Sequence, residues 1–259
     1  MGIVNVTPDS FSDGGRHATT AAAIAHARQL AADGADILDI GGESTRPGAA
    51  TVSMQEELDR VLPVIEGLRD ISVPISIDTW KPQVMRAALA AGASMVNDIN
   101  ALQEEGALKM VVASGAAVCL MHKQGMPQTM QQQPHYTDVI AEVSAFLRDR
   151  IAAVEAAGIA RERIVIDPGF GFGKTLAHNL DLLRELETFC ALGVPVLAGL
   201  SRKSMLGALT GRDVTERLAA SVVAALLAVQ RGAAIVRVHD VRETVDMLRI
   251  WNAVNGSEQ

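Results

Sequence analysis

The stretch from residue 73 to residue 98 decides the fold and reads VPISIDTWKPQVMRAALAAGASMVND. It opens with a short apolar run rich in β-branched residues, Val73 to Ile77, which ends at the polar residue Asp78. A helical pattern of apolar residues follows from Gln83 to Ala91, and a second strand-like run occupies Ser94 to Asn97. Strand, helix and strand in this order are typical of a βαβ unit, whose two strands are parallel.

The same unit recurs along the whole chain. Helical patterns such as Ala21 to Asp33, Gln55 to Arg69 and Asp138 to Ala157 separate the strand-like runs. There are eight such runs, namely Ile3 to Val6, Asp36 to Ile40, Val73 to Ile77, Ser94 to Asn97, Ala116 to Met121, Arg163 to Ile166, Val194 to Leu200 and Ala234 to Val238. An open doubly wound sheet more often stops at about five or six strands, whereas eight βα units close into a barrel. We therefore predict an α/β protein, a (β/α)8 TIM barrel, with a single domain over residues 1–259.

Composition and charge exclude several classes of protein. Hydrophobic residues make up 49% of the chain and charged residues 20%, which excludes a disordered protein. The net charge of -7 and the lack of any Lys/Arg run predict neither a nucleic acid nor a membrane as partner. No secretory signal pattern is recognisable, and the longest apolar run, Ala219 to Val229, is too short to span a bilayer. Because the chain also has only two distant cysteines, we expect a cytoplasmic protein.

Polar residues gather where the predicted strands end. They are Asn5, Asp39, Asp78, Asn97 with Asp98, His122, Asp167, and Arg237 with His239. A single Asp after a strand is more often a helix N-cap or a turn residue than a functional group. In a barrel, however, the carboxyl ends of all strands surround one mouth, where the catalytic groups of such enzymes lie. We therefore expect these side chains to converge there.

The few aromatic residues point to a flat ligand. Phe11, Trp80, Phe170 and Phe172 follow predicted strands one, three and six, although the chain holds only five Phe, two Trp and one Tyr. Rings in such loops can stack on a planar ligand. The alternative is that they cap the barrel as packing.

Two loops bear on anion binding: the first lacks the pattern of a nucleoside triphosphate site, and the second predicts a phosphate or pyrophosphate site. The segment from Asp167 to Thr175 resembles a P-loop, but Pro168 stands where that pattern requires its first glycine. Its glycines instead allow backbone and Phe side chains to approach a ligand closely. Ser201 to Ser204 opens a helix with two cations, and together with Arg237 and His239 it predicts a phosphate or pyrophosphate site. The alternative for Arg237 is a structural ion pair, for example with Asp240.

The remaining polar groups suit a heterocycle and a hard cation. Asp78, Asn97 and Asp167 together offer the donors and acceptors that a fused heterocycle presents, and they favour an electron-poor ring. The six histidines lack metal-ligand spacing, so zinc is not expected. Asn5 is a candidate oxygen ligand for Mg²⁺, shared with a phosphate.

The motifs follow one another in an order that matches a known family. They are Asn5 to Gly15, Gly41 to Gly48, Ile77 to Thr79, Asn97 to Ile99, Asp167 to Lys174, Ser201 to Ser204 and Arg237 to Asp240. Together they resemble the dihydropteroate synthase family of pterin-binding enzymes, from residue 1 to about residue 250. The related methyltetrahydrofolate-binding methyltransferases share the first two motifs only loosely.

The resemblance implies a transferase of folate biosynthesis. The family condenses p-aminobenzoate with (7,8-dihydropterin-6-yl)methyl diphosphate to give 7,8-dihydropteroate and pyrophosphate. It further implies Mg²⁺ as cofactor, sulfonamides as competitors of p-aminobenzoate, and a homodimer formed through helices of the C-terminal half.

The family's site residues carry over to positions in this chain. The pterin pocket carries over to Asp78, Asn97, Ile99, Met121, Asp167 and Lys203. The diphosphate site carries over to Asn5, Arg46, Arg237 and His239, with Asn5 also as the metal ligand. The p-aminobenzoate pocket carries over to Phe11, Thr45, Pro47, Phe172, Lys203 and Ser204. Catalytic contributions are expected from Asp78, Asp167, Lys203, Arg237 and His239.

Two other functions compete with this interpretation. A methyltetrahydrofolate-binding methyltransferase domain would have no use for Arg46, Arg237 and His239 as a diphosphate clamp. A non-catalytic pterin binder would be expected to lack at least one of four polar residues, and the chain has all of them: Asn5, Asp78, Asp167 and Lys203. The chain departs from the family pattern at Trp80 and Lys123, and Trp80 is expected to narrow the mouth.

Overall fold

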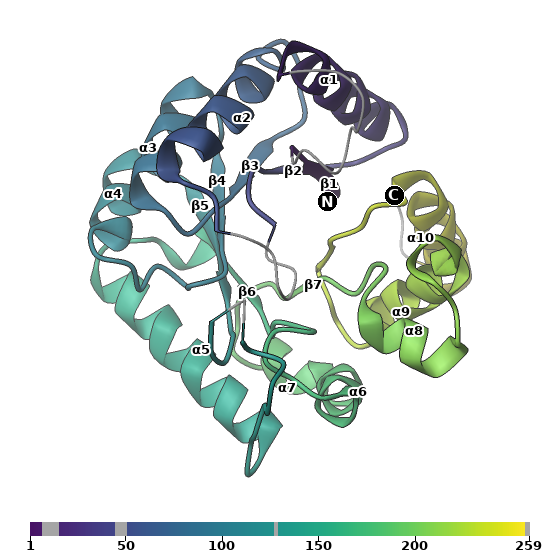
Figure 1. Ribbon diagram of the computed structural model, residues 1–259. Coiled ribbons are helices and arrows are strands. Elements are labelled where there is room, and N and C mark those ends of the chain that lie inside the picture. Colours follow the sequence, from purple (N-terminus) through teal and green to yellow (C-terminus); the bar gives the residue numbers. More distant parts are fainter. Residues whose placement is uncertain (7–15, 45–50, 127–128, 257–259) are drawn as a thin grey trace.

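The computed structural model describes residues 1–6, 16–44, 51–126 and 129–256. Within these ranges it has eight parallel strands, which helices surround in a ring (Figure 1). The strands are β1 (Gly2–Asn5), β2 (Leu38–Gly41), β3 (Ile75–Asp78), β4 (Met95–Asp98), β5 (Ala117–Met121), β6 (Ile164–Asp167), β7 (Leu197–Ala198) and β8 (Ile235–Val236). This confirms the predicted (β/α)8 TIM barrel.

Hydrogen bonds at two seams close the barrel. The first six strands form one sheet in sequence order, and β7 pairs with β8. Single parallel bridges join the two groups, Ile166 with Val196 and Gly2 with Val238. The sequence predicts a longer seventh strand, from Val194 to Leu200. The strand begins later than predicted because Pro195 has no N–H to donate, so Pro195 contributes to the seam only as the acceptor for the Ile166 N–H, at 3.0 Å.

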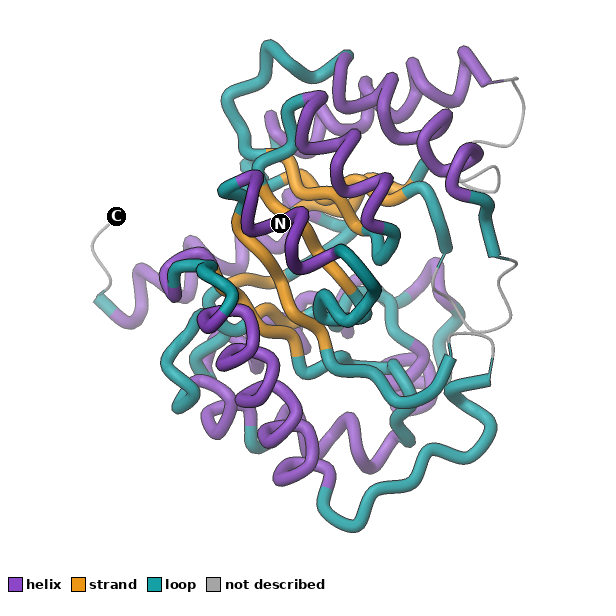
Figure 2. Tube along the Cα trace, turned by 90° about the vertical axis from the view of Figure 1, so that its left-hand side faces the viewer, coloured by secondary structure: helices purple, strands orange, loops and turns teal. Residues whose placement is uncertain are grey.

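The helices lie outside the strands (Figure 2). They are α1 (Arg16–Ala32), α2 (Met54–Glu66), α3 (Pro82–Ala91), α4 (Ala107–Ser114), α5 (Val139–Ala156), α6 (Leu176–Arg184), α7 (Leu186–Cys190), α8 (Ser204–Thr210), α9 (Leu218–Gln230) and α10 (Val241–Asn255), with short 3-10 helices at Arg161–Arg163 and Val214–Glu216. Across the part of the chain that the structure describes, no helix has the length and apolar character needed to cross a membrane.

Alternation along each strand divides the side chains into two sets. Residues such as Val96 and Ile166 belong to the large apolar core that packs under the helices. Their neighbours Met95 and Val165 belong to a second, smaller apolar cluster. Because side chains two residues apart lie on the same face of a strand, the polar residue Asn97 points to the same side as Met95. The barrel interior is therefore apolar at its N-terminal end and polar towards the mouth.

The loop after β6 requires glycine at a particular position. Gly169 has a φ of +74°, and a Cβ atom added there would overlap the backbone carbonyl oxygen of His122. Gly211 has a similar φ of +70° but no atom within 4 Å of such a Cβ. The two positions therefore separate the cost of the left-handed conformation from the cost of a backbone clash.

We predict that Gly169→Ala destabilises the protein more than Gly211→Ala. The control should lose about 1–2 kcal/mol, the cost of placing a side chain in the left-handed region. Gly169→Ala carries the same cost and in addition must move the His122 backbone. Urea unfolding of both variants checks this, and equal losses of unfolding free energy would show that the loop adapts without strain.

Candidate active site

A half-buried arginine lies at the centre of the polar end of the barrel. Arg237, just after β8, donates from Nε to Asp39 Oδ2 at 2.6 Å and from Nη2 to Asp78 Oδ2 at 2.7 Å. Asn97 Nδ2 also donates to Asp39 Oδ2, at 3.0 Å. Residues from β2, β3, β4 and β8 thus meet around one guanidinium group.

Burial and the charges of this cluster shift the pKa values of Arg237 and Asp78. Burial opposes the charge of Arg237, but the carboxylates of Asp39 and Asp78 outweigh it and raise the pKa of the guanidinium. For Asp78, burial raises the pKa to about 7; Arg237 opposes this rise, and Asp39 adds to it. Asp78 therefore changes its charge within the neutral range, next to a permanently charged arginine.

Asp167 supplies the second carboxylate of the site. Burial raises the pKa of Asp167, while the Gly169 N–H and the charges of Lys203 and Lys174 oppose this rise. The Gly169 N–H donates to Asp167 Oδ1 at 2.7 Å. The carboxylate is thus fixed by the loop that follows it.

Lys203 and Phe172 face one another above this carboxylate. The Lys203 Nζ atom lies 4.3 Å from the centroid of the Phe172 ring, which is a cation–π contact. Lys203 is placed by Arg202, whose backbone adopts a φ of +58° and whose side chain pairs with Asp240. Ser204 is exposed and begins α8.

His239 is held by the loop after β7. Its Nδ1 atom lies 3.0 Å from Ser201 Oγ, and its backbone N–H donates to the same oxygen at 3.2 Å. The alternative pairing of Arg237 with Asp240 is wrong, because Arg202 forms that ion pair instead. Arg237 is nevertheless a paired cation, with Asp39 and Asp78 as its partners.

Several residues expected at the mouth lie elsewhere. Asp98 follows Asn97 and so points to the opposite face, where it accepts the N–H groups of Asn100 and Leu102. His122 also points away and packs edge-on against Phe146 of α5, with ring centroids 5.0 Å apart. Asp98 and His122 were expected to face the mouth. They face the helices because neighbouring residues of a strand point to opposite faces.

Two of the aromatic residues pack within the protein, as the alternative interpretation holds. Phe170 is 1% exposed and belongs to the large core. Trp80 is half-buried and donates from its indole nitrogen to Glu43. Phe172 contacts a site residue, Lys203. Ile99 and Met121 are buried, as expected for apolar walls.

Sequence reasoning placed Asp39 at the mouth but gave it no role, and it did not single out Glu43. Asp39 was expected at the end of a strand but is the second residue of β2, and it is fully buried beside Arg237. Its position on the inward face could have been read from alternation, but its partners are 58 and 198 residues away in the chain.

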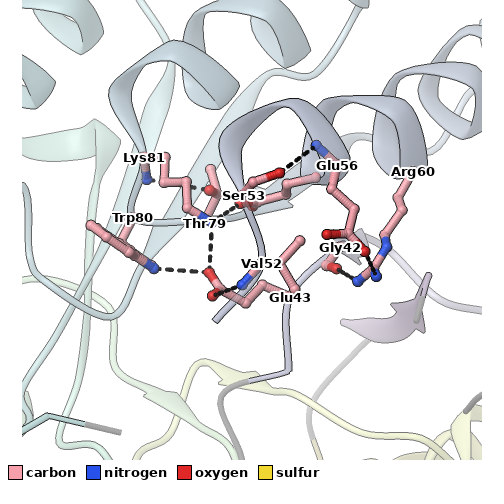
Figure 3. A network of polar contacts seen from close by, with 10 residues as sticks. Gly42, Glu43, Val52, Ser53, Glu56, Arg60, Thr79, Trp80 and Lys81 are labelled. Carbon is pink, nitrogen blue, oxygen red and sulfur yellow. Dashed lines mark hydrogen bonds and ion pairs between the residues drawn. The ribbon is translucent and has the colours of Figure 1, made fainter. Parts of the chain in front are cut away.

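Glu43 joins the ends of two loops near the mouth (Figure 3). Its Oε1 atom accepts the Val52 N–H at 3.0 Å, and its Oε2 atom accepts from Trp80 Nε1 at 3.0 Å and from Lys81 Nζ at 2.8 Å. Lys81 also contacts the fully buried carboxylate of Glu57, at 2.5 Å. Trp80 is thus tied to the start of the β2–α2 loop.

Some expected site residues fall outside the described ranges. Phe11, Thr45, Arg46 and Pro47 belong to this group. Asn5 is described and ends β1 with a half-buried side chain. Among the residues of known placement there is no group of three His, Cys, Asp or Glu that could hold a metal ion.

One surface groove of the described residues lies away from the barrel mouth. A groove of about 830 Å³ lies between α3 and α4 and is lined by residues such as Arg86, Leu89 and Met110. It contains none of the clustered carboxylates. We therefore place the candidate site by the buried polar groups.

We predict that Asp39→Asn is strongly destabilising. The variant breaks the ion pair between Arg237 and the fully buried Asp39 carboxylate and leaves Arg237 with Asp78 alone, and breaking a buried ion pair costs about 3–5 kcal/mol. Because Asp39 also raises the pKa of Asp78, that pKa should fall below about 7 in the variant. Denaturant unfolding and an NMR titration of Asp78 measure the two effects. Asp70→Asn, which removes the exposed partner of Arg28, is the control and should change neither value.

Comparisons with known proteins agree with this geometry. Residues 1–239 match the family of pterin binding enzymes. The chain is 51% identical to the dihydropteroate synthase of Escherichia coli strain K12, over 100% of this chain and 92% of that protein. It is 58% identical to the Xanthomonas albilineans enzyme solved with 4-aminobenzoic acid, with a TM-score of 0.94 over 100% of this chain and 93% of that one.

A further solved structure is similar over nearly the whole chain. It is the Yersinia pestis dihydropteroate synthase in complex with a sulfonamide drug, 49% identical, with a TM-score of 0.94 over 99% of this chain and 94% of that one. The resemblance inferred from the motifs is thereby confirmed. The chain belongs to the dihydropteroate synthases, transferases of the pterin-binding enzyme family.

Proposed function

We propose that the polar end of this barrel condenses p-aminobenzoate with (7,8-dihydropterin-6-yl)methyl diphosphate, as the chain's family membership implies. The observation that carries the proposal is the convergence of Asp78, Asn97 and Arg237 inside the barrel. The products are 7,8-dihydropteroate and pyrophosphate, so the reaction is a step of folate biosynthesis. The carbon–oxygen bond to the diphosphate breaks, and a carbon–nitrogen bond to the aniline forms.

The pterin would bind to the buried acceptors. Asp78, Asn97 and Asp167 offer oxygen and amide groups to the donors and acceptors of the ring, and Lys203 completes the polar edge. Ile99 and Met121 would pack on its faces. Positive charge develops on the pterin as the diphosphate leaves, so the two carboxylates would stabilise the transition state.

The diphosphate would lie against Arg237 and His239. Arg237 forms ion pairs with both Asp39 and Asp78. These partners hold the guanidinium group in position before a ligand binds. His239 is oriented by Ser201. Arg46 is proposed as a further cation, and no step is assigned to it from geometry. No protein nucleophile is needed, since the aniline attacks as a neutral amine.

Asn5 is the proposed protein ligand of Mg²⁺. A single amide oxygen fits a cation that takes most of its ligands from a diphosphate and water, and among the described residues no group of three His, Cys, Asp or Glu could hold a metal ion. When bound, the metal would neutralise charge on the leaving group. A site of this kind would form only with the substrate present.

The p-aminobenzoate would lie over Phe172. Its carboxylate end would face Lys203 and Ser204, and Phe11, Thr45 and Pro47 are proposed to complete the pocket. The same contacts would accept a sulfonamide, so we propose that sulfonamides compete with p-aminobenzoate.

The assembly and setting of the protein are also proposals. We infer that residues 1–259 act as one pterin-binding barrel domain in the cytoplasm. We further infer a homodimer through the C-terminal helices, because Val223, Ile250 and Val254 of α9 and α10 are 56%, 68% and 77% exposed. An apolar surface of this kind favours contact with a second protein.

Pyrophosphate release tests the proposed reaction. We predict release when the protein is mixed with the pterin diphosphate, p-aminobenzoate and Mg²⁺, and inhibition by a sulfonamide that added p-aminobenzoate relieves. Binding of methyltetrahydrofolate without any pyrophosphate release would favour the methyltransferase alternative. Binding of the pterin alone, with no turnover, would favour the non-catalytic alternative.

We predict that Asp167→Asn weakens pterin binding with little change in fold. The amide replaces one acceptor by a donor and leaves a ligand N–H unpaired, which costs about 1–3 kcal/mol. Calorimetry with 6-hydroxymethyl-7,8-dihydropterin measures this loss. The control is Asp138→Asn, since Asp138 caps α5 and Asn is an equally good N-cap. Unchanged affinity in Asp167→Asn would remove this carboxylate from the pterin site.

A further inference from the structure

A lysine in the loop after β6 is turned into the protein. Lys174 stands where a P-loop would carry its phosphate-binding lysine, yet it is only 2% exposed. Its Nζ atom donates to Gly169 O at 3.0 Å and to Phe172 O at 3.1 Å, and lies 3.0 Å from His122 Nδ1. Three acceptors match the three hydrogens of an ammonium group. Lys174 is therefore fully engaged by its own loop and by His122.

His122 is an acceptor in this arrangement. Burial and the charge of Lys174 lower the pKa of His122 to about 3, so its ring is neutral at physiological pH. A neutral ring whose Nδ1 atom accepts from Lys174 carries its proton on Nε2. The His122 backbone N–H donates to Asp167 O at 3.0 Å. The acceptor is thus attached to the last residue of β6.

Gly169 connects this lysine to the proposed pterin site through its two backbone polar groups. Its N–H donates to the Asp167 carboxylate, and its carbonyl accepts from Lys174. Phe172 is held in a parallel way, because its carbonyl accepts from Lys174 and its ring lies against Lys203. Asp167 and Phe172 are therefore both held through backbone groups of the loop, and the Lys174 ammonium group binds the carbonyls of that loop.

A buried charge is a costly way to hold a loop. Burial lowers the pKa of Lys174 to about 7, and Asp167 only partly opposes this effect. An uncharged side chain could fill the same space without the cost of desolvation. The retained charge therefore points to a role besides stability.

We propose that Lys174, with neutral His122 as its acceptor, is a positioning residue that orients the Asp167 carboxylate and the Phe172 ring for pterin and p-aminobenzoate. The proposal rests on the proposed function of this site. The Lys174 Nζ atom contacts groups of the protein, and we assign it no contact with a substrate.

The first test replaces the ammonium by an apolar group of similar length. Lys174→Met should weaken binding of 6-hydroxymethyl-7,8-dihydropterin at least tenfold in calorimetry and raise the KM for p-aminobenzoate, while the melting temperature stays within a few degrees of the parent. Lys109→Met, on the exposed face of α4, is the control and should match the parent. Parent-like pterin affinity in Lys174→Met would overturn the proposal.

A second pair of variants tests the acceptor and does not depend on the folding of Lys174→Met. His122→Leu removes the acceptor for Lys174 and should also weaken pterin binding. His122→Asn places an amide oxygen near the former Nδ1 position and should restore most of the affinity. Equal affinities in these two variants would show that the ring serves packing against Phe146 alone.

The pH dependence separates positioning from simple packing. The charged or titratable groups near Lys174 are His122 after β5, Asp167 of β6, Lys203 after β7 and Tyr136 before α5. As pH rises through about 7, Lys174 loses one hydrogen and its charge, so this part of the pterin affinity should fall. In Lys174→Met, the pH dependence of pterin affinity that comes from Lys174 should be absent, and the part that comes from Asp78 should remain. An identical pH profile in the two proteins would contradict the proposal.

The outcomes also separate this proposal from the proposed function. If the parent releases pyrophosphate and the Lys174 and His122 variants bind pterin equally well, only the positioning role fails. If the parent neither binds the pterin nor releases pyrophosphate, the proposed function itself fails.

Discussion

The ion pairs of Arg237 with Asp39 and Asp78 are the constraint on which the polar half of the barrel depends. A guanidinium group inside a barrel needs carboxylate partners, and carboxylates buried there need the guanidinium group. Asp39 also accepts a hydrogen bond from Asn97, so the cluster connects β2, β3 and β4 with the residue that follows β8. Removing Arg237 would leave both carboxylates without their cationic partner. The cluster consequently fixes both the closure of the barrel near β8 and the charge that a ligand meets at its mouth.

Two described loop segments near the mouth are held by the same kind of interaction. Glu43 ties the start of the β2–α2 loop to Val52 and to the β3–α3 turn. Lys174 ties the loop after β6 to His122. In each case one buried charged side chain accepts or donates several hydrogen bonds, including bonds to backbone groups. Such a group can order a loop that has little apolar surface of its own, at the cost of desolvating a charge. Trp80 is part of the first network.

The sequence predicts much of the fold and the outline of the site. All eight strands fall within or beside the predicted runs, because short β-branched runs between helical patterns are a local signal. The residues expected around the pterin lie at the carboxyl ends of strands, or in the loops that follow, as a barrel requires. The errors concern direction. Asp98 and His122 end strands as predicted, but they face the helices, since the inward or outward face depends on the register of the whole sheet.

The sequence by itself therefore determined the order of the strands and helices, the family and the residue types of the site. It did so because periodicity and motifs are properties of neighbouring residues. Only the tertiary structure decided that Arg237 lies between Asp39 and Asp78, and that Lys174 turns inward to His122. These contacts join residues that are 198, 159 and 52 positions apart in the chain. Closing the barrel brings them together, and no local pattern encodes which buried charges will then become partners.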